Sequence, residues 1–350
     1  MNRREWLKDM GAAGGLLLLS PSAFGCGKNG SETAVSVPVR TGSKTARVAF
    51  VKTSNRAEGV KRAIELLGFK DEFKGKHVFV KPNFNSADEF PGSTHNDTLL
   101  ALTGELRSLG SKEMTIGDRS GMGDTAAVLR SKDIPALARD QKAATLVFDE
   151  LKEEDWELFR FENSLWKNGF AIPKPFLASD AIVQTCCLKT HRFGGHFTLS
   201  LKNSVGLAAK RVPGNSYNFM SELHSSPNQR GMIAEINASY KQALVVLDGV
   251  EAFTDGGPDK GTKVASNVII AGTDRIAIDA VGVAVLRHFG TTSNVSKGAI
   301  FEQEQIAQAV KLGLGVTGPE QIEILTDGKE SRAYADEIGR QFSLKEEAGN

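Results

Sequence analysis

Residues 77–118 read HVFVKPNFNSADEFPGSTHNDTLLALTGELRSLGSKEMTIGD, and this stretch decides the fold. Two apolar runs, at 77–82 and 113–117, have the length of buried strands, and the residues at 98–109 between them have the apolar spacing of an amphipathic helix. A strand, a helix and a second strand in this order are typical of parallel neighbours in one sheet. The stretch therefore predicts one unit of a parallel α/β sheet.

The same alternation continues on both sides of this stretch. Aromatic residues at 156–170 lack a helical period and predict an antiparallel excursion or an edge hairpin. The other strand runs are almost continuously apolar, as in strands that are covered on both faces. We predict an α/β fold at 46–345, with a mostly parallel, doubly wound (Rossmann-like) sheet and helices on both faces. The further strands are expected at 48–52, 145–149, 181–187, 244–247, 267–271 and 322–326, and the further helices at 57–67, 125–140, 231–242, 276–289 and 302–312.

Composition and charge exclude several classes of protein. The 350 residues include 43 Lys and Arg against 42 Asp and Glu, and 40% are hydrophobic, so the chain is not of the disordered class. A net charge of +1 gives no general footprint for nucleic acid, which is bound by neutralising its phosphates. Three cysteines are too few for an all-cysteine iron–sulfur cluster, which needs four thiolates.

The first 25 residues have the pattern of a twin-arginine signal peptide. Arg3 and Arg4 are followed by Trp6, Leu7 and Lys8, and an apolar run at 11–19 is too short for a stable membrane span. We therefore expect the twin-arginine translocation machinery as a partner. The expected location is the periplasm or the outer side of the cytoplasmic membrane.

Cys26 is the one expected point of contact with a membrane. The sequence Ala23-Phe24-Gly25-Cys26 resembles a degenerate lipobox, and it equally satisfies the small-x-small rule for simple cleavage before Cys26. A stretch at 26–45, rich in Gly, Ser, Thr and Val, has no strong period and is expected to be a tether or linker. Lipidation of Cys26 and simple cleavage are both open at this point.

The polar residues that follow the predicted strands are the candidates for a binding site. Open α/β sheets bind ligands in the crevice beyond the carboxyl ends of their strands. Charged and amide side chains are more frequent there than turns alone require, although Asn, Asp and Gly are also ordinary turn residues. These side chains include Lys81, Asn83, Asp118, Arg119, Lys189, His191 and Asp248.

The richest stretch is 189–206, KTHRFGGHFTLSLKNSVG. Its basic residues Lys189, Arg192 and Lys202, near a helix start at 198–200, predict a site for phosphate, sulfate or carboxylate. His191 and His196 bracket a Gly-Gly turn, where histidines bind a divalent metal or move protons. The alternative for each histidine is an ordinary hydrogen-bonded loop residue.

These residues receive separate expected roles. Lys189, His191 and Lys202 are expected to converge in one crevice as catalytic residues, with the lysines holding an anion and His191 acting as acid, base or ligand. Asp118 and Asp248 are expected to face the same crevice and, with His196, to bind a metal or orient His191. The cofactor is left unknown, with a divalent metal as the candidate. The expected substrate-binding residues are Lys81, Asn83, Arg119, Arg192 and Asn203.

Taken together, the motifs resemble those of the domain of unknown function family 362 (DUF362), in order from about residue 48 to 286. The resemblance implies an α/β fold and shared crevice residues, and it is to the exported subset with a twin-arginine leader. It does not supply a reaction, and this chain lacks the cysteines of relatives that carry a ferredoxin-like module. The motifs are Val80-Lys81-Pro82-Asn83, Gly117-Asp118, Lys189-Thr190-His191, Leu201-Lys202-Asn203 with Gly206, Leu247-Asp248-Gly249, Ala271-Gly272-Thr273-Asp274 and Ile278-Asp279-Ala280.

Two functions follow from the sequence. The first is an exported enzyme that acts on a small anionic substrate in the crevice. The second is a non-catalytic exported protein, with or without a lipid, that binds a solute or a metal in the same place. Turnover separates them, since only an enzyme releases a changed product. The sequence has no Gly-x-Ser-x-Gly, His-Glu-x-x-His or Cys-x-x-Cys motif, which excludes the commonest classes of hydrolase, zinc protease and thioredoxin-like protein.

Overall fold

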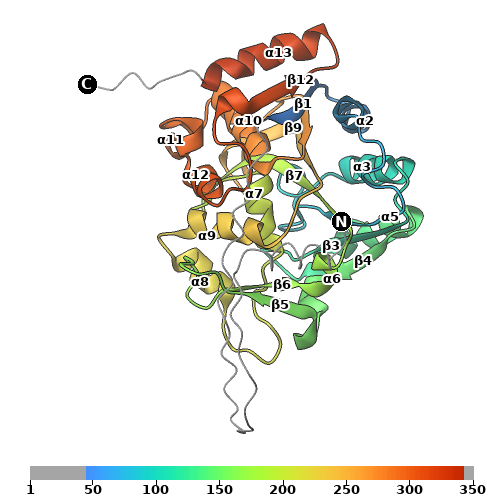
Figure 1. The fold of residues 1–350 in the computed structure, drawn as a ribbon, viewed down its shortest axis with the longest axis vertical. Helices are drawn as coiled ribbons and strands as arrows, with labels where there is room; N and C mark the ends of the chain where they lie inside the picture. The colour runs from blue at the N-terminus through green and yellow to red at the C-terminus, as the bar shows by residue number, and fades with distance from the viewer. Residues whose placement is uncertain (1–44, 343–350) are drawn as a thin grey trace, which may run out of the picture.

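The computed structural model describes residues 45–342. The expected signal peptide at 1–25, Cys26 and nearly all of the expected tether therefore lie outside the described residues. Within residues 45–342 the main sheet has ten strands, and its central path runs β12-β1-β11-β9-β7-β2-β3-β4 (Figure 1). The strands of this path are β1 (Ala46–Lys52), β2 (His77–Lys81), β3 (Glu113–Asp118), β4 (Ala144–Val147), β7 (Ala181–His191), β9 (Leu244–Gly256), β11 (Val268–Gly272) and β12 (Ile322–Leu325).

The sheet is mostly parallel, as the sequence predicts. β2 pairs in parallel with β3 and β7, and β7 pairs in parallel with β9. Along the central path β11 is the exception, because it runs antiparallel to both β1 and β9. No helix separates β9 from β11; a hairpin through β10 (Gly261–Val264) connects them, and a connection without a crossover reverses the chain direction.

Helices cover both faces of the sheet, which confirms the doubly wound prediction. Side chains alternate along each strand, so Val48 and Phe50 pack on one face of β1 while Ala49 and Val51 pack on the other. Figure 1 shows α2 and α3 on one side of the strands and α10 and α12 on the other. The first face carries α2 (Arg56–Leu67), α3 (Asn96–Ser108), α4 (Thr125–Ser131) and α5 (Ile134–Asp140). The second carries α7 (Ser200–Asn203), α9 (Gln229–Ile236), α10 (Arg275–His288), α11 (Ser293–Ser296), α12 (Glu304–Lys311) and α13 (Lys329–Gly339).

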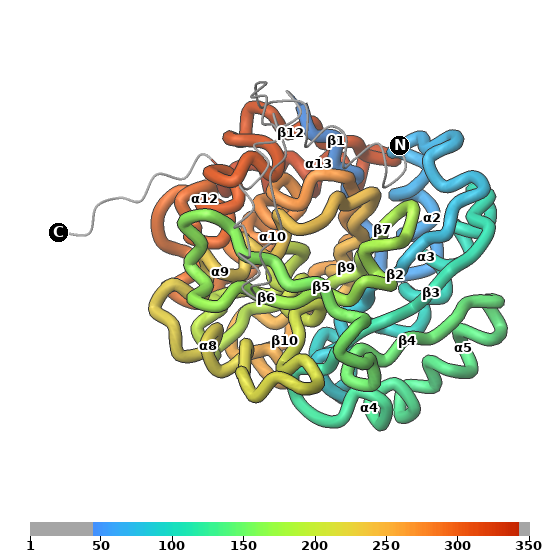
Figure 2. The backbone as a smooth tube through the Cα atoms, turned by 60° about the horizontal axis from the view of Figure 1, so that its bottom comes forward, coloured from blue at the N-terminus to red at the C-terminus, as the bar shows by residue number. Residues whose placement is uncertain are grey.

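The aromatic residues at 156–170 belong to a separate antiparallel pair. β5 (Trp156–Phe159) and β6 (Phe170–Pro173) form a two-stranded sheet that does not join the main one. Figure 2 shows this pair beside α8 (Phe219–Ser225) and α9. Its aromatic rings and α6 (Lys174–Leu177) share a core with those helices, in which Phe159 stacks on Phe170 at 5.7 Å between ring centroids. The predicted antiparallel excursion is therefore confirmed.

Several expected boundaries are wrong. The single helix expected at 125–140 is two helices, because the chain turns at Asp133, whose φ is 54°, and Pro135 lies in the first turn of α5. The strand expected to end at 187 continues to His191, and the strand expected to end at 247 continues to Gly256. Along residues 45–342, no helix combines the length and the apolar character needed to cross a membrane.

Candidate functional site

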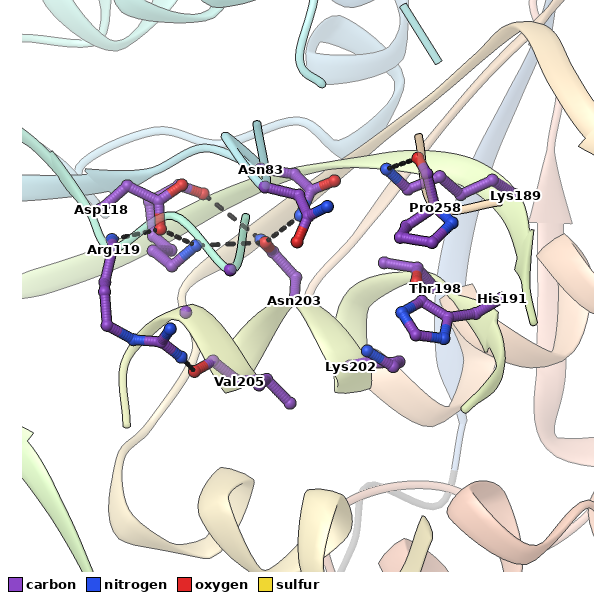
Figure 3. A pocket seen from close by; sticks show the side chains of 14 residues that line it. Asn83, Asp118, Arg119, Lys189, His191, Thr198, Lys202, Asn203, Val205 and Pro258 are labelled. Carbon is purple, nitrogen blue, oxygen red and sulfur yellow. Dashed lines mark hydrogen bonds and ion pairs between the residues drawn. The ribbon is translucent and has the colours of Figure 1, made fainter. Parts of the chain in front are cut away.

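A pocket lies where β2, β3 and β7 end, which is the predicted edge of the sheet (Figure 3). Its cavity volume is about 40 Å³, which is room for about three water molecules and therefore for a very small ligand. Eight residues that the sequence nominates line it, namely Lys81, Asn83, Asp118, Arg119, Lys189, His191, Lys202 and Asn203.

Three strands and one short helix position these side chains. β7 carries Lys189 and His191, and then reverses into β8 (His196–Thr198), which pairs with it. α7 follows directly and carries Lys202. Asp279 of α10 fixes the start of α7, because its carboxylate accepts hydrogen bonds from the backbone N–H groups of Ser200 (2.7 Å) and Leu201 (3.1 Å).

Lys81 and Asp118 form a buried ion pair on one wall. Lys81 Nζ lies 2.6 Å from Asp118 Oδ1, and both side chains are almost fully buried. Burial lowers the pKa of Lys81 and raises the pKa of Asp118, and the attraction between the two charges opposes both shifts. A Cβ at Gly206 would lie 2.7 Å from Asp118 Oδ1 and 2.8 Å from Lys81 Nζ. The pair therefore needs glycine at 206.

Asn203 ties α7 to the ends of the strands. Its Oδ1 accepts hydrogen bonds from Lys81 Nζ (3.2 Å) and Asn83 Nδ2 (3.3 Å), and its Nδ2 donates to Gln184 Oε1 (3.0 Å). Figure 3 shows this side chain between Asp118 and Lys202. The contacts give Asn203 a positioning role within the protein.

Arg119 donates hydrogen bonds to backbone carbonyl groups of its own loop and of the segment that follows α7. Its guanidinium donates to the carbonyl oxygens of Ala208 (2.8 Å), Val205 (2.5 Å) and Ser120 (3.3 Å). The side chain borders the pocket, but these bonds hold its donors toward the protein. Its contribution to the pocket is therefore a fixed positive charge.

Lys189 is fully buried and donates to two backbone carbonyls. Its Nζ lies 2.6 Å from the oxygen of Gly92 and 3.1 Å from that of Pro258. Burial lowers its pKa. Because the side chain has no exposed surface, it acts on a ligand in the pocket through its charge and not through a direct contact.

Lys202 differs from the other three cations because its ammonium group has no hydrogen bond or ion pair with any residue in 45–342. The side chain is 7% exposed. Burial, and then the charges of Lys189 and Arg119, lower its pKa from 10.5 to about 7. At neutral pH the amine is thus present in both protonated and neutral forms.

His191 lies next to Lys202 (Figure 3). Both lie against Gly195, where an added Cβ would be 2.3 Å from Lys202 Cε and 3.2 Å from His191 Nδ1. Burial and the positive charges of Lys202 and Lys189 hold the pKa of His191 well below 6.5, so the ring is neutral at pH 7. Its Nδ1 is buried and has no hydrogen-bond partner among the described residues.

Asp248 does not face the pocket, contrary to the prediction. Because β9 continues beyond it, Asp248 lies within a strand, and its side chain shares the face of Val246 and Val250. There its carboxylate accepts hydrogen bonds from Arg56 Nε of α2 (2.9 Å) and from the hydroxyl group of Thr98 on α3.

Arg192 and His196 also do not line the pocket. Arg192 points to the rim, where its guanidinium is 2.7 Å from Asp259 Oδ1 and stacks on the ring of Phe193. His196 has a φ of 60°, the left-handed conformation used by the tight reversal between β7 and β8. Arg230 and Glu304 are the charges nearest to it.

The metal set of Asp118, Asp248 and His196 is therefore not assembled. Along the part of the chain that the structure describes, no group of three or more His, Cys, Asp or Glu side chains could hold a metal ion. The carboxylate in the pocket is already paired with Lys81, and the other ionic groups there are cations, which repel a metal ion. The residues present do not fit a divalent metal.

The site residues nominated from the sequence leave out three polar residues at this site. Asn85 and Thr198 line the pocket, and Asn85 Nδ2 and Thr198 Oγ1 are buried with no partner among the described residues. His224 of α8 is close enough for its charge to lower the pKa of His191. Thr198 lies in the stretch 189–206, which could have revealed it, whereas no pattern connects His224 to that stretch.

Comparison with known proteins gives a distant structural neighbour and a family. No curated protein matches the chain. The structure of the lactate racemase apoprotein from Thermoanaerobacterium thermosaccharolyticum aligns with 20% sequence identity and a TM-score of 0.40. The alignment covers 69% of this chain and 57% of that chain. A similarity at this level carries no conclusion about function.

The model of a domain of unknown function (DUF362) matches residues 78–284. The matched residues run from β2 to α10 and include all eight pocket residues that the sequence nominated, together with Asp279. The match covers more than half of the sequence and confirms the resemblance of the motifs, so the chain belongs to the DUF362 family.

Proposed function

We propose that this protein is an enzyme that acts on a small anion in the pocket at the ends of β2, β3 and β7. The observation that carries the proposal is the ammonium group of Lys202, which lines the pocket at the end of a largely buried residue and has no hydrogen-bond or ion-pair partner among residues 45–342. A charge that is largely removed from water without a partner costs free energy, and a bound anion reduces that cost. Perturbed groups of this kind gather at functional sites.

The charges of the whole pocket favour the same ligand. Among the described residues that line it, Lys81, Arg119, Lys189 and Lys202 are cations and Asp118 is the one carboxylate. Asp118 neutralises Lys81, which leaves the others without a counter-charge in the pocket. A small carboxylate, phosphate or sulfate would supply it and would accept a hydrogen bond from Lys202.

The same side chains can move protons at neutral pH. Lys202 has a pKa of about 7, and the neutral ring of His191 beside it has a free Nδ1. Lys202 can therefore donate or accept a proton at neutral pH, where a pKa near the working pH makes general acid–base catalysis most effective, and the unpartnered Nδ1 of His191 lies beside it. This pairing supports an enzyme in preference to a carrier.

Calorimetric titration with acetate, propionate, phosphate and sulfate tests the binding. We expect at least one anion to bind the wild type and to bind Lys202→Met on the order of tenfold more weakly, since an interaction with a charged group is typically worth 1.5–3 kcal/mol. Lys61→Met is the matched control, because Lys61 lies on α2 with a 60% exposed side chain. Equal affinity of the wild type and Lys202→Met would contradict the proposal.

Turnover tests the enzymatic part. The wild type is incubated with a mixture of small organic acids, and mass spectrometry follows which acid is consumed and which product appears. Loss of one acid in the wild type but not in His191→Ala supports an enzyme. Saturable binding without any product would instead show that the protein is a binding protein.

We also propose that the protein is exported by the twin-arginine pathway, and that the mature chain carries a lipid at Cys26. The paired Arg3 and Arg4 with the apolar run at 11–19 support export, and the resemblance of 23–26 to a lipobox supports the lipid.

A further inference from the structure

We propose that Lys202 forms a covalent imine with the carbonyl group of a small acid that carries an aldehyde or ketone. The inference rests on the proposed function, because it names the substrate class and the reacting atom of the same pocket. It begins from the difference between Lys202 and the other cations of the pocket.

The other cations have fixed partners that favour the charged form, although burial lowers the pKa of each. Lys81 has the carboxylate of Asp118, Lys189 has two carbonyl oxygens, and Arg119 has three. Lys202 has none of these within the described chain, and its charged neighbours are cations. Burial among like charges favours the neutral amine, and only the neutral amine has the lone pair that attacks a carbonyl carbon.

Lys189 supplies a fixed positive charge beside Lys202. Its side chain lines the pocket but has no exposed surface, and its Nζ donates to two carbonyl oxygens, so it acts on a ligand through its charge. Lys202 lies close enough for its pKa to respond to that charge. An acid group attracted toward Lys189 would place a neighbouring carbonyl group near the amine of Lys202.

His191 can carry the protons that the reaction requires. Lys202 Nζ attacks the carbonyl carbon, the C–N bond forms, and the carbonyl oxygen takes up a proton to give a carbinolamine. The C–O bond then breaks and water leaves, so that both hydrogens of the amine end in that water. The free Nδ1 of His191 beside Lys202 can accept a proton from the nitrogen and return it to the departing hydroxyl.

Reductive trapping tests the proposal on the full-length wild-type protein. The protein is incubated at pH 7 with pyruvate, glyoxylate or 2-oxoglutarate and with sodium cyanoborohydride, which reduces an imine to a stable amine. A digest then locates the adduct, whose mass is that of the acid minus water plus two hydrogens. We expect the adduct at Lys202 to form at least about tenfold faster than at Lys61, because an ordinary lysine is almost fully protonated at pH 7.

The exposed Lys61 in the same digest is an internal control that needs no variant. Excess acetate or propionate, which have no carbonyl group to form an imine, should slow labelling of Lys202 and leave Lys61 unaffected. Lys202→Arg keeps the charge and cannot form an imine, so it should bind these acids and lose the fast adduct. Labelling of Lys202 at the rate of Lys61, or no adduct at Lys202, would overturn the proposal.

The two proposals fail in different ways. If acetate or propionate binds the wild type and Lys202→Arg but Lys202 is not labelled by any of the three oxo acids, the imine is wrong and the anion site stands. If neither binding nor labelling occurs, both proposals are wrong.

Discussion

Lys202 and Asp118 are buried charged side chains of one pocket with opposite surroundings. Asp118 is bonded to Lys81 and to two backbone N–H groups, whereas Lys202 has no partner in residues 45–342. We expect Lys202→Met to raise the free energy of unfolding at pH 7 by about 1 kcal/mol, since it removes a charge that is largely withdrawn from water and has no partner among the described residues. Asp118→Asn removes the ion-pair partner of Lys81 and should lower the free energy of unfolding by about 3 kcal/mol or more.

Urea unfolding of both variants measures this contrast. A loss of stability in Lys202→Met as large as that in Asp118→Asn would give Lys202 a structural role, and it would remove the main argument for a ligand.

Gly195 provides a second prediction at the scale of single residues. A Cβ there would be 2.3 Å from Lys202 Cε, so Gly195→Ala must move the end of the lysine side chain. We expect anion affinity to fall on the order of tenfold, because a displacement of about 1 Å at a site is costly. Gly104→Ala in α3 is the matched control, since its added Cβ meets no atom within 4 Å. Titration calorimetry measures the anion affinity of the wild type and of both variants. Equal affinity of the wild type and Gly195→Ala would show that the position of Lys202 is unimportant for binding.

At the scale of elements, α7 depends on a carboxylate from α10. Burial raises the pKa of Asp279 from 3.8 to about 7, although its hydrogen bonds from Ser200 and Leu201 lower it. Between these two values the folded protein retains a proton that the unfolded chain has lost, so this group makes stability fall as the pH rises from about 4 to 7. The change is up to about 1.4 kcal/mol for each pH unit.

Asp279→Asn should remove this part of the pH dependence. Urea unfolding at pH 5 and pH 8 measures it, and we expect the wild type to lose more stability than the variant between the two. The same loss in both would mean that Asp279 does not titrate in this range. Its role as the fixed support of α7 would then rest on the contacts to Ser200 and Leu201 alone.

At the scale of the whole molecule, export is the property to be tested first. The receptor of the twin-arginine pathway reads the guanidinium pair, and lysine lacks this planar group. We expect replacement of both Arg3 and Arg4 by Lys to leave the precursor in the cytoplasm, as shown by cell fractionation. Normal export of the double variant would contradict the twin-arginine signal.

The lipid is a separate prediction. If Cys26 is lipidated, the mature protein should sediment with membranes, and Cys26→Ser should release it, because acyl chains supply the membrane affinity. A fully soluble mature protein that begins at Cys26 would establish simple cleavage instead.

The sequence alone determined the architecture and most of the pocket. Apolar runs that alternate with amphipathic stretches are local patterns, and they placed β2, β3 and β7 correctly in a mostly parallel sheet. Because parallel strands end at one edge, the residues after those strands had to meet there. Lys81, Asp118, Lys189 and His191 therefore lie at one pocket, and the chain then returns Lys202 to it on α7.

Only the tertiary structure decided which of these charges are neutralised. Asp248 lies inside β9, on the face of the sheet that α2 and α3 cover, and bonds to residues of those helices. His224 comes near the pocket on α8, which is distant in the sequence. Lys81 and Lys202 look alike in the sequence, but one meets a carboxylate from another strand and the other does not. The physical reason is that strand and helix patterns are local, whereas the protonation state of a buried group depends on distant segments that pack around it.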